Sequence, residues 1–247
     1  MTTRAFLGID CGTQSTKALL LDAETGATLA IGRAGHELIE RRDGTREQHP
    51  DWWVAALIAA VRGALRSAGE VAVAGIGVSG QQHGLVCLDQ ADRPLRAAKL
   101  WNDTTTAEEC DLLTERLGGA HEVLRLTGNL FLPGYTAPKV AWLLRHEPDA
   151  YGATRRMCLP HDFLNLWLTG RLVTEPGDAS GTAYFDARSR RYSDSVLAAL
   201  DPARDWQSSL PPVVDSLSAV GELRAEAREA LGIREVPVVS AGGGDNM

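Results

Sequence analysis

The sequence has 247 residues, enough for one large domain or two small ones with a proper hydrophobic core. Its 44% hydrophobic and 23% charged residues are usual for a globular protein. The net charge of −7 argues against nucleic acid or an anionic membrane as a partner held by broad electrostatic attraction. The four cysteines form no close pair, so neither a zinc site nor a disulfide framework is predicted. With no signal peptide or bilayer-spanning run, we expect a cytoplasmic protein with reduced thiols.

The first hundred residues alternate between strand and helix patterns. Three short apolar runs, Ala5–Asp10, Lys17–Asp22 and Thr28–Ala34, are joined by tight turns and predict an antiparallel meander. Asp51–Ala68 has apolar residues at helical spacing, and Val71–Ser79 is a continuous apolar run typical of a buried strand. This order predicts an α/β fold built on a mixed sheet with flanking helices.

Residues from about 100 to 200 break this regularity and predict an inserted subdomain. The subdomain is expected to contain three helices, Thr104–Leu117, Ala137–His146 and Asp162–Leu168. After it we expect a helix at Arg224–Leu231 and a strand at Val236–Ser240. Asp162 is interpreted as a helix cap with no chemical role.

The first candidate site is a glycine-rich turn between two predicted strands, Gly8–Lys17 (GIDCGTQSTK). A strand delivers Asp10, and Gly12 lets the backbone turn tightly toward a ligand. The side chains that can bind a phosphate here are those of Thr13, Gln14, Ser15 and Lys17. Such a hairpin can hold a phosphate group, with Asp10 placed to bind the accompanying Mg²⁺ through water. A plain polar β-turn is the alternative, and no Walker A motif occurs.

The second candidate site is Ala241–Met247 (AGGGDNM), directly after the last predicted strand. Its three glycines permit close backbone approach, and Asp245 follows them. A carboxylate on a rigid turn can accept a proton from a hydroxyl while that oxygen attacks a γ-phosphate. Asp245 can equally cap a following helix. Because a domain does not normally finish on such a loop, we expect the chain to be truncated.

Taken together, these motifs resemble the FGGY family of carbohydrate kinases, which share the actin/hexokinase-like ATPase (ribonuclease H-like) fold. GIDCGTQSTK resembles the family's first phosphate motif, Gly134–His146 (GYTAPKVAWLLRH) its N-terminal signature, and AGGGDN the loop of its catalytic base. The resemblance covers the whole chain, with the motifs in the family's order. It implies ATP and Mg²⁺ as cofactors, Asp245 as general base, Asp10 as the second catalytic acid, and both acids near the metal.

One clue to the substrate is Ser79–Gly84 (SGQQHG), which follows a predicted strand, where α/β sheets bind ligands. Gln82 and His83 can donate and accept hydrogen bonds to a polyol. A satisfied loop histidine is the alternative for His83. The segment resembles the xylulokinase branch of the family, except that Gln82 stands where Met is usual.

A second clue is Leu100–Asp103 (LWND), which also resembles that branch. Trp101 offers an apolar face to a sugar, and Asn102 and Asp103 offer polar contacts. The alternatives are a core position for Trp101 and a helix cap for Asp103.

The resemblance therefore implies phosphorylation of a ketopentose, most simply D-xylulose to D-xylulose 5-phosphate. A family kinase acting on ribulose, gluconate or glycerol, and a non-catalytic sugar-binding module, are the alternatives. In the family the adenosine pocket belongs to a C-terminal domain. We therefore expect residues 1–247 to form an N-terminal domain that is inactive alone, with a sugar as partner and a homodimer as one assembly to consider.

Overall fold

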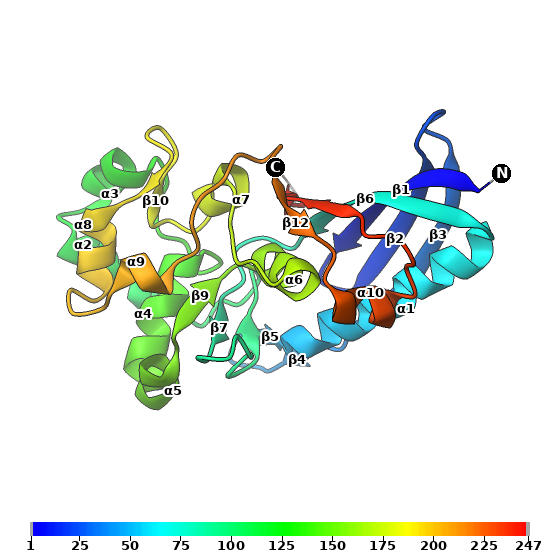
Figure 1. The fold of residues 1–247 in the computed structure, drawn as a ribbon. Helices are drawn as coiled ribbons and strands as arrows, with labels where there is room; N and C mark the ends of the chain where they lie inside the picture. The colour runs from blue at the N-terminus through cyan, green and yellow to red at the C-terminus, as the bar shows by residue number, and fades with distance from the viewer. Residues whose placement is uncertain (1, 246–247) are drawn as a thin grey trace.

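The computed structural model describes residues 2–245, which form a twisted sheet at one end and a mostly helical part at the other (Figure 1). The main sheet has the order β12 (Ala219–Glu222), β13 (Val238–Ser240), β6 (Val71–Gly80), β1 (Thr3–Cys11), β2 (Ser15–Asp22) and β3 (Thr28–Gly35), and the short β14 (Gly243–Gly244) also pairs with β6. The β1–β2–β3 meander is antiparallel, whereas β1, β13 and β14 run parallel to β6. The predicted meander and mixed sheet are confirmed.

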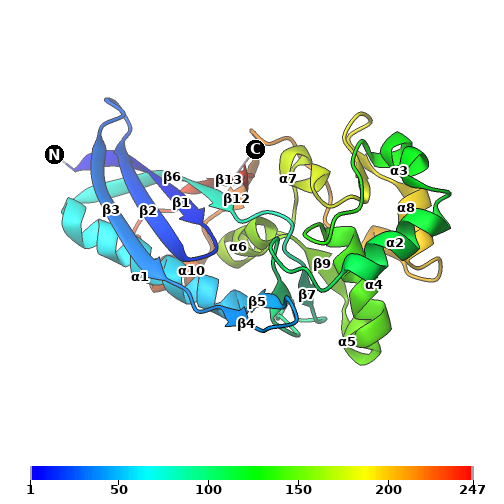
Figure 2. The ribbon, with the colours of Figure 1, turned by 180° about the vertical axis from the view of Figure 1, so that it is seen from behind.

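Helices α1 (Pro50–Ala68), α6 (Pro160–Thr169) and α10 (Ala225–Leu231) pack together beside the sheet (Figures 1 and 2). Alternate residues of β1, among them Leu7 and Ile9, are buried in the same core as Trp53 and Leu57 of α1. Because successive strand residues point to opposite faces, Asp10 lies on the face of β1 that these helices do not cover. The helix predicted over Asp51–Ala68 is confirmed.

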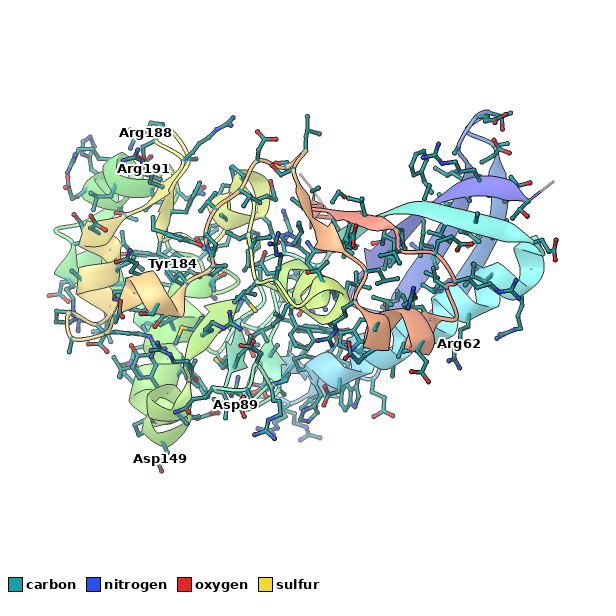
Figure 3. All side chains as sticks on the ribbon, viewed as in Figure 1. Arg62, Asp89, Asp149, Tyr184, Arg188 and Arg191 are labelled. Atoms are coloured by element: carbon teal, nitrogen blue, oxygen red, sulfur yellow. The ribbon has the colours of Figure 1, made fainter. Side chains whose placement is uncertain are left out.

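The helical part surrounds a second buried cluster, to which Leu113, Leu143, Tyr184 and Leu197 contribute. Its helices are α2 (Ala107–Arg116), α3 (Ala120–Thr127), α4 (Thr136–His146), α5 (Pro148–Ala153), α8 (Asp194–Leu200) and α9 (Trp206–Ser209), with α7 (Pro176–Ser180) lying between this part and the sheet. Figure 3 shows Tyr184 inside this part and Arg188 and Arg191 on the outer hairpin.

Three small sheets complete the described chain. They consist of β7 (Val86–Leu88) with β9 (Arg156–Cys158), β10 (Phe185–Asp186) with β11 (Arg191–Tyr192), and β4 (Ile39–Glu40), β5 (Arg46–Gln48) and β8 (Ala98–Lys99).

Helix α6 lies within the range predicted for the insertion, yet its side chains Phe163, Leu164 and Leu166 belong to the core of the main sheet. The boundaries of about 100 and 200 stay a prediction. No helix within residues 2–245 is long and apolar enough to cross a membrane.

Candidate active site

An open cleft of about 960 Å³ lies at the C-terminal ends of β1 and β6, on the sheet face that α1 leaves uncovered. Its lining includes Asp10 and Lys17 from the first predicted site and Gly242–Asp245 from the second. The fold thus brings together two glycine-rich segments that are more than 200 residues apart in the sequence. Asn246 and Met247 of the second motif lie outside the described residues.

Strand register explains why Asp10 and the loop of Asp245 lie on the two sides of Ser79, near the end of β6. Asp10 pairs with Ser79 across the parallel β1–β6 ladder, and Gly243 pairs with the same Ser79 from the other side of β6. The backbone N–H of Asp245 then donates to the carbonyl of Gly80 at 2.9 Å. Asp10 and Asp245 therefore stand on either side of the end of β6.

The charges in this cleft affect one another. Lys17 Nζ lies 3.2 Å from Asp10 Oδ2 in an exposed ion pair. Partial burial, with the negative charges of Asp10 and Asp178, raises the pKa of Asp245 above its ordinary value. A carboxylate with a raised pKa is a stronger base, which suits proton abstraction from a hydroxyl.

Gln82 lies directly against the loop of Asp245. A Cβ built on Gly244 would come within 2.8 Å of Gln82 Cγ and Nε2, so a larger residue at position 244 would displace this side chain. Gln82 Nε2 and Asn102 Oδ1 are both buried without a hydrogen-bond partner within residues 2–245. Buried polar atoms that lack partners are costly, so these two amide groups have hydrogen-bonding capacity that the described residues leave unused.

His83 is held in an unusual conformation. Its φ of 60° is in the left-handed region, where a residue other than glycine is strained. Its ring lies 4.8 Å from that of Tyr135, and a Cβ on Gly181 would collide with it. Burial and the nearby charge of Lys139 lower the pKa of His83 to about 4. The imidazole is therefore neutral at pH 7 and can both donate and accept a hydrogen bond.

Trp101 joins the predicted sugar segment to the predicted phosphate turn. The indole is 49% exposed, and its Nε1 donates to Thr13 Oγ1 at 2.9 Å. Its exposed face leaves it free to receive the apolar side of a ligand.

The other residues of the phosphate turn differ in how exposed they are to a ligand. The N–H of Gly12 donates to the carbonyl of Ser15 and closes the turn, and the Gln14 side chain is exposed. Ser15 is buried and accepts a hydrogen bond from Arg33 Nε at 3.1 Å. Gly12 and Gln14 are thus accessible, whereas the hydroxyl of Ser15 is already engaged within the protein.

Asp103 faces the protein interior. It is fully buried, and its Oδ2 accepts from the Arg46 N–H at 2.9 Å and from Lys99 Nζ at 3.0 Å. Oδ1 accepts from Thr105. A sugar contact by Asp103 stays a prediction, and these contacts favour a role in holding the LWND segment.

Gln48, which was not singled out from the sequence, holds two segments of the site together through hydrogen bonds. Its Nε2 donates to the carbonyls of Thr13 and Glu37, and its Oε1 accepts from Trp53 Nε1 and Gln81 Nε2, all at 2.8–2.9 Å. This buried amide joins the phosphate turn to the SGQQHG loop. No sequence signal marks it, because its partners come from separate segments.

Also missed from the sequence was a buried cluster of His161, Asp162 and Asp178, which lies next to Gly80 at the start of the SGQQHG loop. His161 Nδ1 lies 2.6 Å from Asp178 Oδ2, and His161 Nε2 lies 3.3 Å from Asp162 Oδ1. Burial alone would lower the pKa of His161, but the charges of Asp162 and Asp178 outweigh it and raise the pKa to about 9. Asp162 also accepts the Leu159 N–H, so its predicted capping role is consistent with the structure.

This cluster predicts a pH dependence of stability. Because the folded pKa of His161 exceeds its ordinary value of 6.5, its contribution is complete below pH 6.5 and is lost as pH rises through about 9. We expect the urea midpoint to fall over this interval. In His161→Gln, the dependence of the free energy of unfolding on pH should be shallower by about one proton. Equal slopes in the two proteins would contradict the assignment.

The two acids in the cleft also fit Mg²⁺. No group of three potential metal-binding side chains occurs within residues 2–245. Mg²⁺ is, however, commonly bound through one or two carboxylates together with substrate phosphates. Asp10 and Asp245 supply such a pair at the end of β6.

Comparisons with known proteins show which family the chain belongs to. The profile of the FGGY family of carbohydrate kinases, N-terminal domain, matches residues 5–247. The chain belongs to this family. Xylulose kinase of Haemophilus influenzae is 46% identical over 248 residues, which cover 98% of this chain and 50% of that protein. The FGGY chain therefore spans about half the length of the curated relatives that it matches.

Solved structures show the same fold. Xylulose kinase from Rhodospirillum rubrum superposes with a TM-score of 0.91 at 26% identity, covering 98% of this chain and 49% of that one. Gluconate kinase from Lactobacillus acidophilus superposes with a TM-score of 0.90 at 24% sequence identity, covering 99% of this chain and 48% of that one. The predicted actin-like ATPase fold of this FGGY domain is confirmed, and because the gluconate kinase shares it, the fold alone does not select the sugar.

Proposed function

We propose that this chain is the sugar-binding half of an enzyme that transfers a phosphoryl group from ATP to D-xylulose, giving D-xylulose 5-phosphate. The observation that carries this proposal is the contact between Gly244, next to Asp245, and Gln82 of the SGQQHG loop. It supports a site in which a carboxylate of raised pKa lies near the unpartnered amide nitrogen of Gln82, a group that suits a polyol.

In the proposed reaction, Gln82, His83 and Asn102 hold the sugar hydroxyls while Trp101 covers an apolar edge. Asp245 accepts the proton of the terminal hydroxyl as that oxygen attacks the γ-phosphorus of ATP. Gly12 and Thr13 orient phosphate oxygens, and Lys17 neutralises part of their charge. Mg²⁺, held by Asp10 and Asp245 through water or phosphate, would supply further charge neutralisation. Most of the acceleration would come from positioning and electrostatics.

Xylulose is favoured over other sugars by the relatives of higher identity. The Haemophilus influenzae and Escherichia coli proteins, 46% and 37% identical, are both described as xylulose kinases. The LWND and SGQQHG segments support the same choice.

A substrate panel tests this assignment. We expect the whole enzyme to release ADP with a higher kcat/KM for D-xylulose than for D-ribulose, D-gluconate or glycerol. Binding to the 247-residue chain can be followed by tryptophan fluorescence, with Trp101→Phe identifying the reporting indole. A preference for another sugar would overturn the substrate, and sugar binding without any ADP release would favour the non-catalytic module.

A further inference from the structure

Lys139 is a buried lysine with no carboxylate of the described residues within ion-pair distance. The side chain is fully buried in α4, and no carboxylate of residues 2–245 lies within 4.0 Å of its ammonium. Nζ donates instead to the backbone carbonyls of His83 and Gly134, both at 2.5 Å. The other buried lysine, Lys99, has Asp103 at 3.0 Å. Burial lowers the pKa of Lys139 well below its ordinary value, and the charge of Asp103 acts in the opposite direction. A buried lysine with no carboxylate in contact is costly, so its retention calls for a functional reason.

The first carbonyl that Lys139 binds belongs to the strained residue of the sugar loop. The carbonyl of His83 also accepts from Thr136 Oγ1 at 3.2 Å, so α4 supplies two donors to one oxygen. Strained backbone persists only where its surroundings over-determine it. These two hydrogen bonds account for the left-handed conformation of His83.

The second carbonyl links Lys139 to the other predicted sugar segment. Gly134 packs so closely on Trp101 that an added Cβ would lie 2.2 Å from the carbonyl oxygen of Trp101. Movement of the 134 backbone would therefore displace Trp101. One ammonium thus connects the SGQQHG loop with the LWND segment.

The ammonium also acts on the His83 ring electrostatically. Burial is the larger cause of the lowered pKa of His83, and the charge of Lys139 is the second; together they keep the imidazole neutral. The groups beside the ring, Tyr135 and the backbone of Gly181, are uncharged. A neutral ring can donate to one hydroxyl and accept from another.

We propose that Lys139 is a positioning residue for sugar recognition, whose ammonium holds His83 and, through Gly134, Trp101 in the arrangement that receives the sugar hydroxyls. The proposal rests on the proposed function in taking the ligand to be a sugar. The control of His83 by Lys139 does not depend on that function.

The test compares Lys139→Met with Lys99→Met in the 247-residue chain. Calorimetry measures D-xylulose affinity, and NMR follows the titration of the His83 ring. We expect Lys139→Met to lose about tenfold or more in affinity, as for a hydrogen bond to a charged group. Its His83 should titrate at higher pH because the nearby cation is gone. Lys99→Met also removes a buried ammonium and should leave the His83 titration unchanged.

The outcomes separate the two hypotheses. If His83 titrates alike in both variants, or Lys139→Met binds D-xylulose normally, the positioning role is wrong. If His83 shifts only in Lys139→Met while the unaltered chain binds no sugar, the proposed function fails but the control of His83 by Lys139 stands. Should Lys139→Met not fold, Lys139→Gln retains donors for the His83 carbonyl and is expected to give smaller shifts in the same directions.

Discussion

Asp245→Asn should lower the kcat of the whole enzyme by about 10³-fold, within the usual range for loss of a general base. The substitution keeps the size and the backbone hydrogen bond to Gly80 but removes the proton acceptor. Because Gln82, His83 and Asn102 would still hold the sugar, D-xylulose affinity should change by less than about threefold. Steady-state kinetics of ADP release, together with calorimetry of sugar binding, measure the two effects separately.

Glu175→Gln is a matched control for Asp245→Asn. Glu175 lines the same cleft, but its carboxylate accepts hydrogen bonds from the backbone of Gly177 and Asp178 and from Ser216 Oγ. Its loss should reduce stability and leave kcat within about threefold. If Asp245→Asn retained turnover comparable to that of this control, Asp245 would not be the base.

Gly242→Ala should destabilise the protein by roughly 3 kcal/mol, because strained backbone and overpacking each cost about 1–3 kcal/mol. Gly242 has a φ of 69°, and an added Cβ would lie 2.1 Å from the carbonyl oxygen of Val78. This carbonyl belongs to β6, the central strand of the site, so the loop cannot relax without displacing Asp245. Urea unfolding measures the loss of stability.

Gly232→Ala separates the two causes of that loss. Gly232 has a φ of 75° at the end of α10, but its Cβ position is open. We expect a loss of only about 1 kcal/mol from the backbone conformation. Equal losses in the two variants would show that close packing against Val78 does not matter.

The contacts of individual residues show how far the sequence could predict the site. Asp10 and Asp245 were found because each follows an apolar strand and a carboxylate beside glycines is a local pattern. Asp103 shows what such patterns leave open: the LWND segment predicts a sugar contact, and the structure adds that its carboxylate accepts from the backbone N–H of Arg46 and from Lys99 in the interior. Burial of a polar side chain depends on which segments cover it.

Gln48 and His161 could not be predicted for the same reason. The amide of Gln48 has partners 5, 11, 33 and 35 residues away. His161 lies between Asp162, its neighbour in sequence, and Asp178 on another helix. Long-range polar contacts leave no periodic signal, since they require the segments to be folded together first.

By itself, the sequence determined the main strands and helices of the sheet and both glycine-rich turns, and the resemblance of its motifs indicated the kinase family. The strands, helices and turns are set by local periodicity and by backbone conformations that few residues adopt. Only the tertiary structure decided that β6 brings Asp10 and Asp245 to one edge, that Gln82 rests on Gly244, and that Lys139 holds His83. Strand register and burial fix those contacts, and both depend on the whole fold.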